Sequence, residues 1–352
     1  MKILLLTRSQ YGYQTDYQQY ARALVPFGSV VYVGVESGRK PITDSGIEFF
    51  SAMLKGGILR KVFQFLAFGR KVVQACTPDV ILVHYWPGCF LFMFWLWPYR
   101  RKMILDIRTG AVGHGCCVEY LLNRLLVLNT LFFPRVSCIS RTLIRRLGLK
   151  EEKTFWLPLG ANPVPGPEKT FERLSLLYIG TFRHRRLDVM LAGFKIFFDK
   201  VKKLDTIPIA FTIVGDGAPG ELEMLKQWCE THELGGIVSF LGYQPPTRRD
   251  EFLKQANIGI AFVPLLPCYD AQPPTKTFEY LMAGMPVVAT DTSENRSIVT
   301  PTNGVLCRDH ASDFAAALER VYQNRKTFHS KAIRESVAAF SWERIVEEKL
   351  VP

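Results

Sequence analysis

Short apolar runs alternate with longer amphipathic stretches along the chain. The short runs are rich in Val, Ile and Leu, which is typical of buried strands, whereas the longer stretches repeat their apolar positions at helical spacing. In the first half this pattern predicts strands at Lys2–Leu6, Val30–Val35, Val80–His84, Met103–Ile107 and Val136–Ile139, and helices at Asp16–Val25, Gly57–Cys76, Val118–Leu131 and Arg141–Leu147.

The segment Pro158–Pro167 is rich in Pro and Gly and interrupts the alternation, so we expect it to link two units. Beyond it the pattern restarts, with strands predicted at Leu176–Ile179, Ile209–Val214, Ile237–Phe240, Ile258–Phe262, Val287–Ala289 and Gly304–Cys307, and helices at Asp188–Val201, Gly220–His232, Arg249–Gln255, Thr277–Ala283, Ala311–Asn324 and Phe328–Ala339. This rhythm predicts an α/β protein of two Rossmann-like doubly wound units. Ligands of such sheets bind at the carboxyl ends of the strands, so facing units would place the site in a cleft.

The composition agrees with a folded chain of two domains. Its 352 residues exceed what one hydrophobic core usually serves, and 48% hydrophobic with 22% charged residues excludes a disordered protein. The eight cysteines lack metal-ligand spacing and no Asp-x-Asp motif occurs, so no metal site is predicted. Met1–Leu6 begins like a signal peptide, but Thr7 and Arg8 end its apolar run, and we expect a cytoplasmic protein with reduced thiols.

The positive charge is confined to the first half. Residues 1–160 hold 21 Lys and Arg against 9 Asp and Glu, which accounts for the whole net charge of +12. Such asymmetry points to an anionic partner. Nucleic acid is disfavoured, because no helix-turn-helix, zinc-finger or RNA-binding pattern accompanies the charge.

Two apolar segments in this half carry adjacent cations. Cys89–Trp97 is followed by Arg100, Arg101 and Lys102, and aromatic and basic residues alternate along Gly57–Lys71. Neither is long enough to span a bilayer, which takes about 20 residues of helix. Two interpretations stay open: buried helices with solvated cations, or peripheral attachment to an anionic membrane.

The strongest local motif is Pro273–Asp291, a loop followed by a helix, a glycine stop and a buried strand. Lys276 and Glu279 lie one turn apart at the start of that helix. A carboxylate in the first helical turn is suited to the two hydroxyls of a ribose, and the lysine and nearby amides to a phosphate. A simple surface ion pair is the alternative.

A second motif runs from Leu176 to Asp188. A strand ends in the turn at Gly180, and the cationic run Arg183–Arg186 precedes a helix. Guanidinium groups at a strand end suit a diphosphate, because their donors form a fixed fork and stabilise the charge that builds on a leaving group. A solvated basic loop is the alternative reading of this run.

Glycine turns also end the next two strands. Gly215, Gly217 and Gly220 match the G-x-G-x-x-G pattern of dinucleotide-binding folds, but that pattern requires an acid about 20 residues later. The following strand ends in Phe240–Gln244 without one, which disfavours a dehydrogenase. Tyr243, beside the second turn, is a candidate neighbour of a nucleotide base.

The Pro273–Asp291 segment resembles the signature of family four of the retaining GT-B glycosyltransferases, in which P-x-K-x-F-E-Y-x-x-A-G-x-P-V-V-A recurs. The resemblance covers most of the second half and is weaker in the first. It implies that Glu279 binds the nucleotide ribose and that Lys276, Arg183 and Arg186 hold the diphosphate. Gly180, Thr275, Tyr243 and Gly12 would complete the nucleotide-sugar site.

Two positions depart from the family pattern. A second acid usually precedes the ribose-binding one with seven residues between, which is Ala271 here, with Asp270 one position away. Many relatives also carry a histidine near the reacting sugar, where this chain has Arg108. His84 and His114 are alternatives on the acceptor side, and only Gly12 remains of the family's first glycine-rich loop.

The resemblance implies a metal-independent transferase that moves a sugar from a UDP- or GDP-sugar to a saccharide or lipid-linked acceptor with retention, as in polysaccharide biosynthesis. It would act in the cytoplasm, at the inner face of the membrane. Residues 1–165 would bind the acceptor and residues 166–339 the donor, with a last helix at about 340–352 packing back on the first unit. A sugar-nucleotide 2-epimerase and a catalytically inactive polyanion- or membrane-binding protein remain alternatives.

Overall fold

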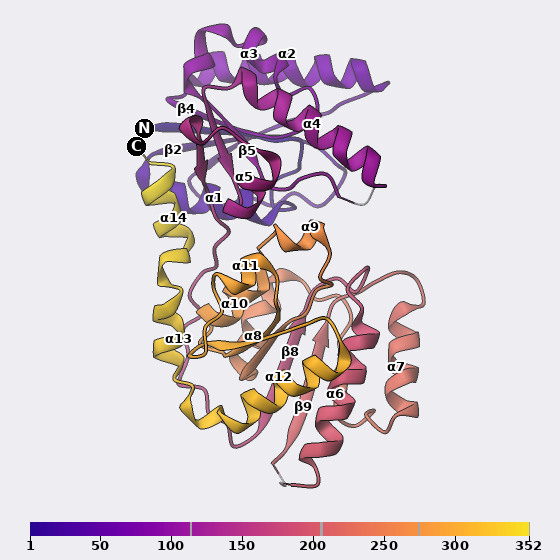
Figure 1. Ribbon diagram of the computed structural model, residues 1–352. Coiled ribbons are helices and arrows are strands. Elements are labelled where there is room, and N and C mark those ends of the chain that lie inside the picture. Colours follow the sequence, from indigo (N-terminus) through magenta and orange to yellow (C-terminus); the bar gives the residue numbers. More distant parts are fainter. Residues whose placement is uncertain (113–114, 205–206, 274, 352) are drawn as a thin grey trace. The chain divides into compact units, whose positions relative to one another are not determined.

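The computed structural model describes residues 1–112, 115–204, 207–273 and 275–351 (Figure 1). The chain forms two compact units. One comprises Met1–Leu159 and Trp342–Pro352, and the other comprises Gly160–Ser341.

The first unit is built on a parallel sheet that has seven strands within the described residues. In spatial order these are β3 (Ile47–Ala52), β2 (Ser29–Val35), β1 (Lys2–Leu6), β4 (Val80–His84), β5 (Met103–Ile107), β6 (Arg135–Cys138) and β7 (Thr154–Trp156). The central strand β1 pairs on both sides, with Leu4 opposite Val31 and Ile81. These central strands are mostly apolar because helices cover both faces of the sheet.

Helices lie on both faces of this sheet (Figure 1). One face carries α2 (Ile58–Cys76), α3 (Leu91–Trp95) and α4 (Cys116–Phe132), with α5 (Arg141–Leu147) beside α4. The other carries α1 (Thr15–Leu24) and the last helix, α14 (Trp342–Lys349). Tyr20 of α1 meets Trp342 edge to face, with ring centroids 5.1 Å apart, so the end of the chain completes the core of the first unit.

The second unit repeats the design with a parallel sheet of six strands among the residues described. Their spatial order is β10 (Val238–Phe240), β9 (Ile209–Val214), β8 (Leu174–Ile179), β11 (Ile258–Ala261), β12 (Val287–Thr290) and β13 (Gly304–Cys307). The prediction of two doubly wound units is therefore confirmed.

The helices of the second unit also divide between the two faces of its sheet (Figure 1). α6 (Leu187–Val201), α7 (Glu221–Thr231) and α12 (Ala311–Gln323) lie together, and α8 (Arg249–Gln255), α10 (Thr275–Met282) and α13 (Ser330–Ser336) cover the opposite face. Two short helices, α9 (Pro267–Asp270) and α11 (Ser293–Arg296), follow the carboxyl ends of β11 and β12.

Each sheet has one point where the strand order reverses. It lies between β1 and β4 in the first unit and between β8 and β11 in the second. Loops leaving such a pair of strands diverge to opposite faces and open a crevice at their carboxyl ends, where ligands bind in this class of fold. The Gly12 loop and His84 follow one pair, and the Gly180 turn follows the other.

Several elements differ from the predictions. β3 and β7 were not expected: β3 is an edge strand whose sequence mixes charged and apolar residues, and β7 is three residues long. The single helix predicted at Phe328–Ala339 is interrupted, because only Ser330–Ser336 is α-helical and a 3-10 turn follows at Ala338–Phe340.

The predicted linker also begins inside the first unit. Leu157 and Leu159 are buried. The carbonyl of Pro158 accepts a hydrogen bond from the Tyr20 hydroxyl at 2.9 Å, so this backbone is fixed before the chain enters the second unit.

Candidate functional site

Three glycine turns meet at the carboxyl edge of the second sheet. The Gly180 amide donates to the Val214 carbonyl at 3.0 Å, and the Gly215 amide donates to the Gly242 carbonyl at 2.9 Å. A Cβ atom placed on Gly215 would lie 1.8 Å from the carbonyl oxygen of Gly180, so the close approach of these turns requires glycine. The motifs recognised separately in the sequence thus form one backbone surface.

Helix α10 is fixed to the same edge by Tyr280. The buried Tyr280 hydroxyl accepts a hydrogen bond from the Ile179 amide at 2.9 Å, one residue before Gly180. Its ring passes over Gly259, where a Cβ atom would lie only 2.3 Å away. The helix that carries Glu279 therefore starts beside the reversal point of the sheet.

Glu279 is a buried carboxylate between two cations. Its side chain is only 6% exposed, its Oε2 accepts from Lys276 Nζ at 2.6 Å, and its Oε1 accepts from Arg249 Nη1 at 3.2 Å. Lys276 and Arg249 are both partly open to solvent. A carboxylate held in this way can exchange a cation for ligand hydroxyls.

The position of Glu279 in its helix differs from the prediction. α10 begins at Thr275, two residues earlier than expected, so Glu279 lies in the second turn and not the first. Arg249 was not recognised from the sequence as part of this cluster, because it lies 30 residues before Glu279 on a different helix.

The basic turn after β8 has an unusual backbone. The Phe182 amide donates to the Asp216 carbonyl at 2.7 Å, and the Arg185 amide donates to the Phe182 carbonyl at 2.9 Å. His184 and Arg186 adopt positive φ angles of 59° and 54°. A residue other than glycine in this backbone conformation destabilises the fold by about 1 kcal/mol or more, and strain of this kind is concentrated at functional sites.

The three arginines of this turn have different surroundings. Arg186 donates to Asp309 at 3.1 Å. The guanidinium of Arg185 lies 4.4 Å from the centroid of the Tyr269 ring, and its buried Nη1 has no hydrogen-bond partner. Arg183 is exposed and has no ion pair with any described residue. Arg183 and Arg185 therefore retain donors that a bound anion would satisfy.

Asp270 and Ala271, where the second acid was sought, lie at the end of α9. The Asp270 carboxylate accepts from the Ser293 amide at 2.7 Å and from the Ser293 hydroxyl at 2.8 Å, which ties it to the start of α11. Ala271 is buried. Tyr243, after the Gly242 turn, is 69% exposed.

In the first unit the Gly12 loop is held by its neighbours. Gly12 has a φ of 85°, and a Cβ atom there would lie 2.5 Å from the side chain of Ile42. The Gln10 side-chain oxygen accepts from the Ser37 amide at 3.0 Å, and its nitrogen donates to the Arg39 carbonyl at 2.9 Å. The loop after β1 is thus packed against the loop after β2.

Arg108 lies inside the first unit. Its guanidinium donates to Asp16 at 2.8 Å and to the Leu157 carbonyl at 2.9 Å, and it lies 5.2 Å from the Tyr20 ring centroid. It is 7% exposed, and Asp106 is 3.7 Å away. The expected acceptor-side arginine therefore neutralises two carboxylates and fixes α1 to the end of the unit.

Of the two histidines predicted on the acceptor side, only His84 lies among the described residues. His84, at the end of β4, meets the Tyr17 ring edge to face with centroids 5.2 Å apart. Burial lowers the pKa of His84 below its ordinary value, so its imidazole is neutral at pH 7. His114 lies outside the described residues.

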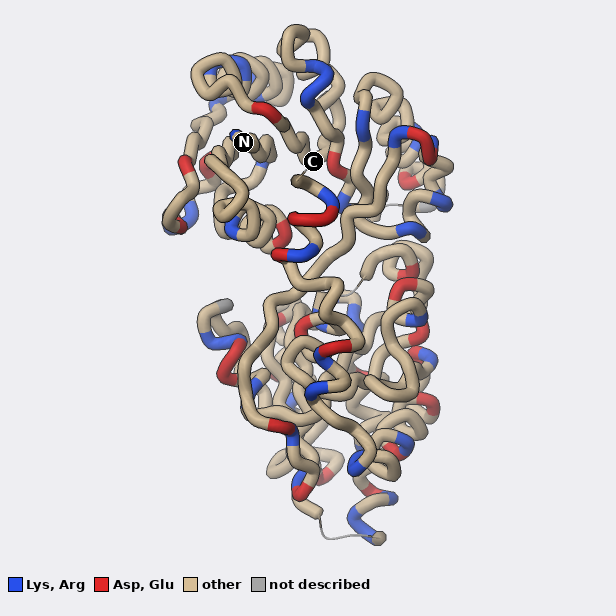
Figure 2. The backbone as a smooth tube through the Cα atoms, turned by 90° about the vertical axis from the view of Figure 1, so that its left-hand side faces the viewer, with Lys and Arg blue, Asp and Glu red and all other residues tan. Residues whose placement is uncertain are grey.

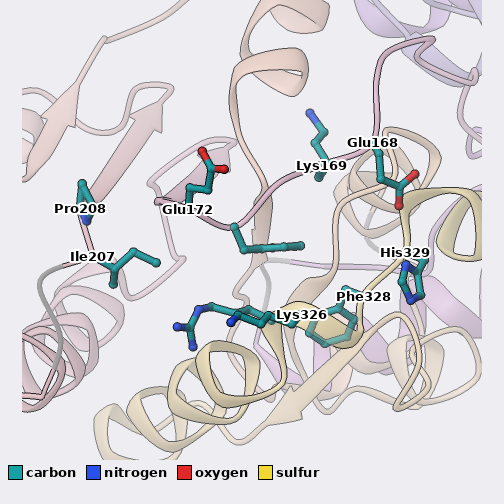
Figure 3. A pocket seen from close by; sticks show the side chains of 10 residues that line it. Glu168, Lys169, Glu172, Ile207, Pro208, Lys326, Phe328 and His329 are labelled. Carbon is teal, nitrogen blue, oxygen red and sulfur yellow. The ribbon is translucent and has the colours of Figure 1, made fainter.

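A cavity of about 690 Å³ lies elsewhere on the second unit (Figure 3). Glu172 and Pro208, which line it, precede β8 and β9, so it lies at the amino ends of the strands. It is therefore on the edge opposite Gly180 and Glu279. Within the described part of the chain, no three His, Cys, Asp or Glu side chains gather as metal ligands would.

Comparison with protein families gives a match in the part of the chain that contains the residues around Glu279. Residues 173–324 match the model of the family described as glycosyl transferases group 1, and this range contains the glycine turns, the basic turn and Glu279. The matched residues lie within the second unit and make up less than half of the chain. No curated protein sequence matches the chain.

Solved structures extend the similarity of fold to both units. Sucrose-phosphate synthase from Thermosynechococcus elongatus superposes with a TM-score of 0.72 at 18% identity, covering 99% of this chain and 97% of that one. HepE from Anabaena in complex with UDP gives 0.70 at 14% identity, with 99% and 98% coverage. The lipopolysaccharide outer core galactosyltransferase WaaB gives 0.69 at 13% identity, with 99% of both chains covered. The chain has the GT-B glycosyltransferase fold.

Proposed function

We propose that the protein transfers a sugar from a nucleoside-diphosphate donor, a UDP- or GDP-sugar, to a saccharide or lipid-linked acceptor. The observation that carries the proposal is Glu279, a buried carboxylate flanked by Lys276 and Arg249 beside the glycine turns of a group 1 domain. HepE, which shares the fold, is described in complex with UDP.

In this proposal the ribose hydroxyls donate hydrogen bonds to the Glu279 carboxylate. Lys276 and Thr275, at the start of α10, face the diphosphate, and Arg183 and Arg186 approach it from the turn after β8. The phosphates would lie beside the closely packed backbone turns at Gly180 and Gly215. Tyr243, whose side chain is exposed beside Gly242, contacts the base.

Arg185, from the same turn, joins Arg183 and Arg186 in this set. Its Nη1 is buried without a partner while its guanidinium plane is held against Tyr269. An unsatisfied buried donor of a charged group is costly, and a phosphate oxygen would remove that cost.

The chemistry proposed is transfer with retention and without a metal. The bond between the anomeric carbon and the donor phosphate oxygen breaks, and the acceptor oxygen forms its bond on the same face. The acceptor proton passes to an oxygen of the departing diphosphate. Arginine and lysine side chains stabilise the charge that develops on that diphosphate, which lowers the barrier because the charge is greatest in the transition state.

The first unit is proposed to bind the acceptor near the reversal point that carries the Gly12 loop and His84. Its excess of positive charge favours peripheral contact with an anionic membrane and hence a lipid-linked acceptor. The proposal therefore includes a role in polysaccharide biosynthesis at the inner face of the membrane. Among the described residues, no helix is both long and apolar enough to cross a bilayer.

A thermal-shift series tests the donor site. UDP, GDP, ADP and their sugar conjugates are added to the wild type and to Glu279→Ala, each at about 100 times its dissociation constant, where binding stabilises the fold by roughly 2.7 kcal/mol. We expect one nucleotide to raise the melting temperature of the wild type and not of the variant. If none does, the donor proposal fails. An equal shift in both proteins would show that Glu279 does not bind the nucleotide.

A further inference from the structure

Helix α4 exposes an apolar stripe although Leu126, on its inner side, is buried. Two of its polar side chains bond inward: Asn123 accepts from the Ala111 amide at 2.8 Å, and the buried Asn129 accepts from the Phe90 amide at 3.4 Å. Its outward side carries an apolar stripe at intervals of three and four residues, formed by Val118, Leu121, Leu125, Leu128 and Phe132. Leu121 alone is 65% exposed. A helix of a globular protein normally has the opposite arrangement.

Aromatic contacts extend this stripe onto two further helices. The Phe132 ring stacks on Phe90 at 5.0 Å between centroids and approaches Phe94 of α3 at 5.9 Å. Trp95, the next residue of α3, meets Phe63 of α2 at 6.2 Å. All three helices lie on one face of the first sheet (Figure 1). We refer to the outward sides of α2, α3 and α4 as the three-helix surface.

The N-terminal end of α2 adds two exposed apolar side chains to the three-helix surface. Ile58 and Leu59 begin this helix and are 81% and 76% exposed. Phe94 and Trp97 are also more than half exposed. Exposed apolar side chains gathered on one face of a folded protein mark a site that contacts a membrane or another protein.

Cations accompany the apolar side chains. α2 and the 3-10 turn η2 (Trp97–Lys102) contain seven Lys and Arg and no Asp or Glu. The Arg100 guanidinium lies 3.8 Å from the Trp97 ring centroid. Figure 2 marks Lys and Arg in blue along the backbone, including that of the unit that contains the N-terminus. Aromatic rings beside cations are typical of protein surfaces at the headgroup level of a membrane.

We propose that the three-helix surface docks on an anionic lipid bilayer. Its leucine and aromatic side chains enter the boundary between headgroups and acyl chains, and the cations of α2 and η2 contact lipid phosphates. A second copy of the chain is a poorer occupant. Two-fold pairing would bring together two surfaces of the same positive charge, and like charges oppose association.

The docked surface adjoins the edge of the first sheet that is proposed to receive the acceptor. α3 follows the loop after β4, and α4 follows the loop after β5, so both start from the carboxyl ends of central strands. This deepens the proposed function and rests on it: a lipid-linked saccharide would present its sugar at that edge while its lipid stays in the bilayer.

Vesicle co-sedimentation of the full-length protein tests the surface. Vesicles contain phosphatidylcholine alone or with phosphatidylglycerol, and binding is measured at low and high salt. We expect binding to the anionic vesicles that weakens as salt screens the lipid charge. Leu121→Glu/Leu128→Glu is expected to lower partitioning into vesicles about tenfold or more, because it replaces two apolar side chains with charged ones. Both side chains are exposed, so we expect the fold to tolerate the change. Arg100→Ser/Arg101→Ser/Lys102→Ser should lower it about 100-fold.

The matched control is Ile196→Glu/Met224→Glu, which adds the same charge at exposed apolar positions of the second unit. It should bind vesicles like the wild type. Absence of vesicle binding, or equal loss in the control, overturns the proposal. So does a dimer in analytical ultracentrifugation that only Leu121→Glu/Leu128→Glu dissolves while vesicles bind neither protein. The nucleotide-induced thermal shift is recorded for every variant, so failure of the docking surface is distinguished from failure of the donor site.

Discussion

Arg249 Nη1 lies 3.2 Å from Oε1 of Glu279, and the pair joins α8 to α10 at the carboxyl edge of the second sheet. The opposite carboxylate oxygen is occupied by Lys276 at 2.6 Å. The two cations hold Glu279 in a single orientation before any ligand arrives. Such preorganisation reduces the entropy that binding would otherwise cost.

Replacement of Arg249 by Met is therefore expected to weaken nucleotide binding about tenfold, since a charge-assisted hydrogen bond contributes about 1.5 kcal/mol or more. Calorimetric titration with the nucleotide identified by thermal shift measures the effect. Arg248→Met is the control, because Arg248 pairs with the exposed Glu251 and not with Glu279. Equal affinities in both variants would show that Arg249 does not position the carboxylate.

Gly215→Ala is expected to destabilise the second unit by about 3 kcal/mol or more. The added Cβ would lie 1.8 Å from the Gly180 carbonyl oxygen, in backbone that cannot turn aside. Gly220→Ala provides the comparison, because Gly220 also has a positive φ, of 82°, but no atom lies within 4 Å of its added Cβ. That variant should lose only roughly 1–2 kcal/mol, the cost of the backbone conformation. Differential scanning calorimetry of both proteins measures the difference.

Much of the fold follows from the sequence because central parallel strands are buried on both faces. The runs Lys2–Leu6, Val80–His84 and Met103–Ile107 are mostly apolar, and their predicted bounds agree with the structure. Edge strand β3 was missed because it packs less completely and carries Glu48 and Ser51 among its apolar residues. Local pattern reports burial, and edge strands are only partly buried.

The site was less accessible to sequence reasoning because its side chains meet across long separations. Glycine turns and Glu279 were recognised from motifs within single segments. Arg249 contacts Glu279 from another helix, and Arg108 forms an ion pair with Asp16, which lies 92 residues earlier in the chain. No spacing within one motif encodes such pairs, since they arise only when the sheet has formed.

His84 is expected to make the first unit sensitive to acid. Burial lowers its folded-state pKa, whereas in the unfolded chain the group takes a proton near pH 6.5. The unfolded state thus binds more protons below about pH 6.5, and stability is lost as pH falls through that value towards the folded pKa. The melting temperature of the wild type should fall further between pH 7 and pH 5 than that of His84→Gln.

Two features sharpen the His84 comparison. Burial raises the pKa of the neighbouring Asp106, which acts in the opposite direction but is present in both proteins. His310→Gln, at an exposed position of the second unit, should retain the full acid sensitivity of the wild type. If the melting temperatures of the wild type and His84→Gln fall equally between pH 7 and pH 5, His84 is not the source of the acid sensitivity.

Arg185 is expected to act on the reaction more than on donor binding. Its guanidinium lies against the Tyr269 ring with Nη1 unpaired, so it can donate to an oxygen whose charge grows as the sugar bond breaks. Arg185→Met should lower kcat about 100-fold, the usual loss for one such donor, with a smaller change in KM. Arg185→Lys should recover only part of the rate, because a lysine keeps the charge but not the planar fork. Arg173→Met, at the exposed amino end of β8, is the control and should leave both constants unchanged. Donor hydrolysis and transfer kinetics measure these values, and a fall in melting temperature with unchanged kcat would mean that Arg185 only supports the turn.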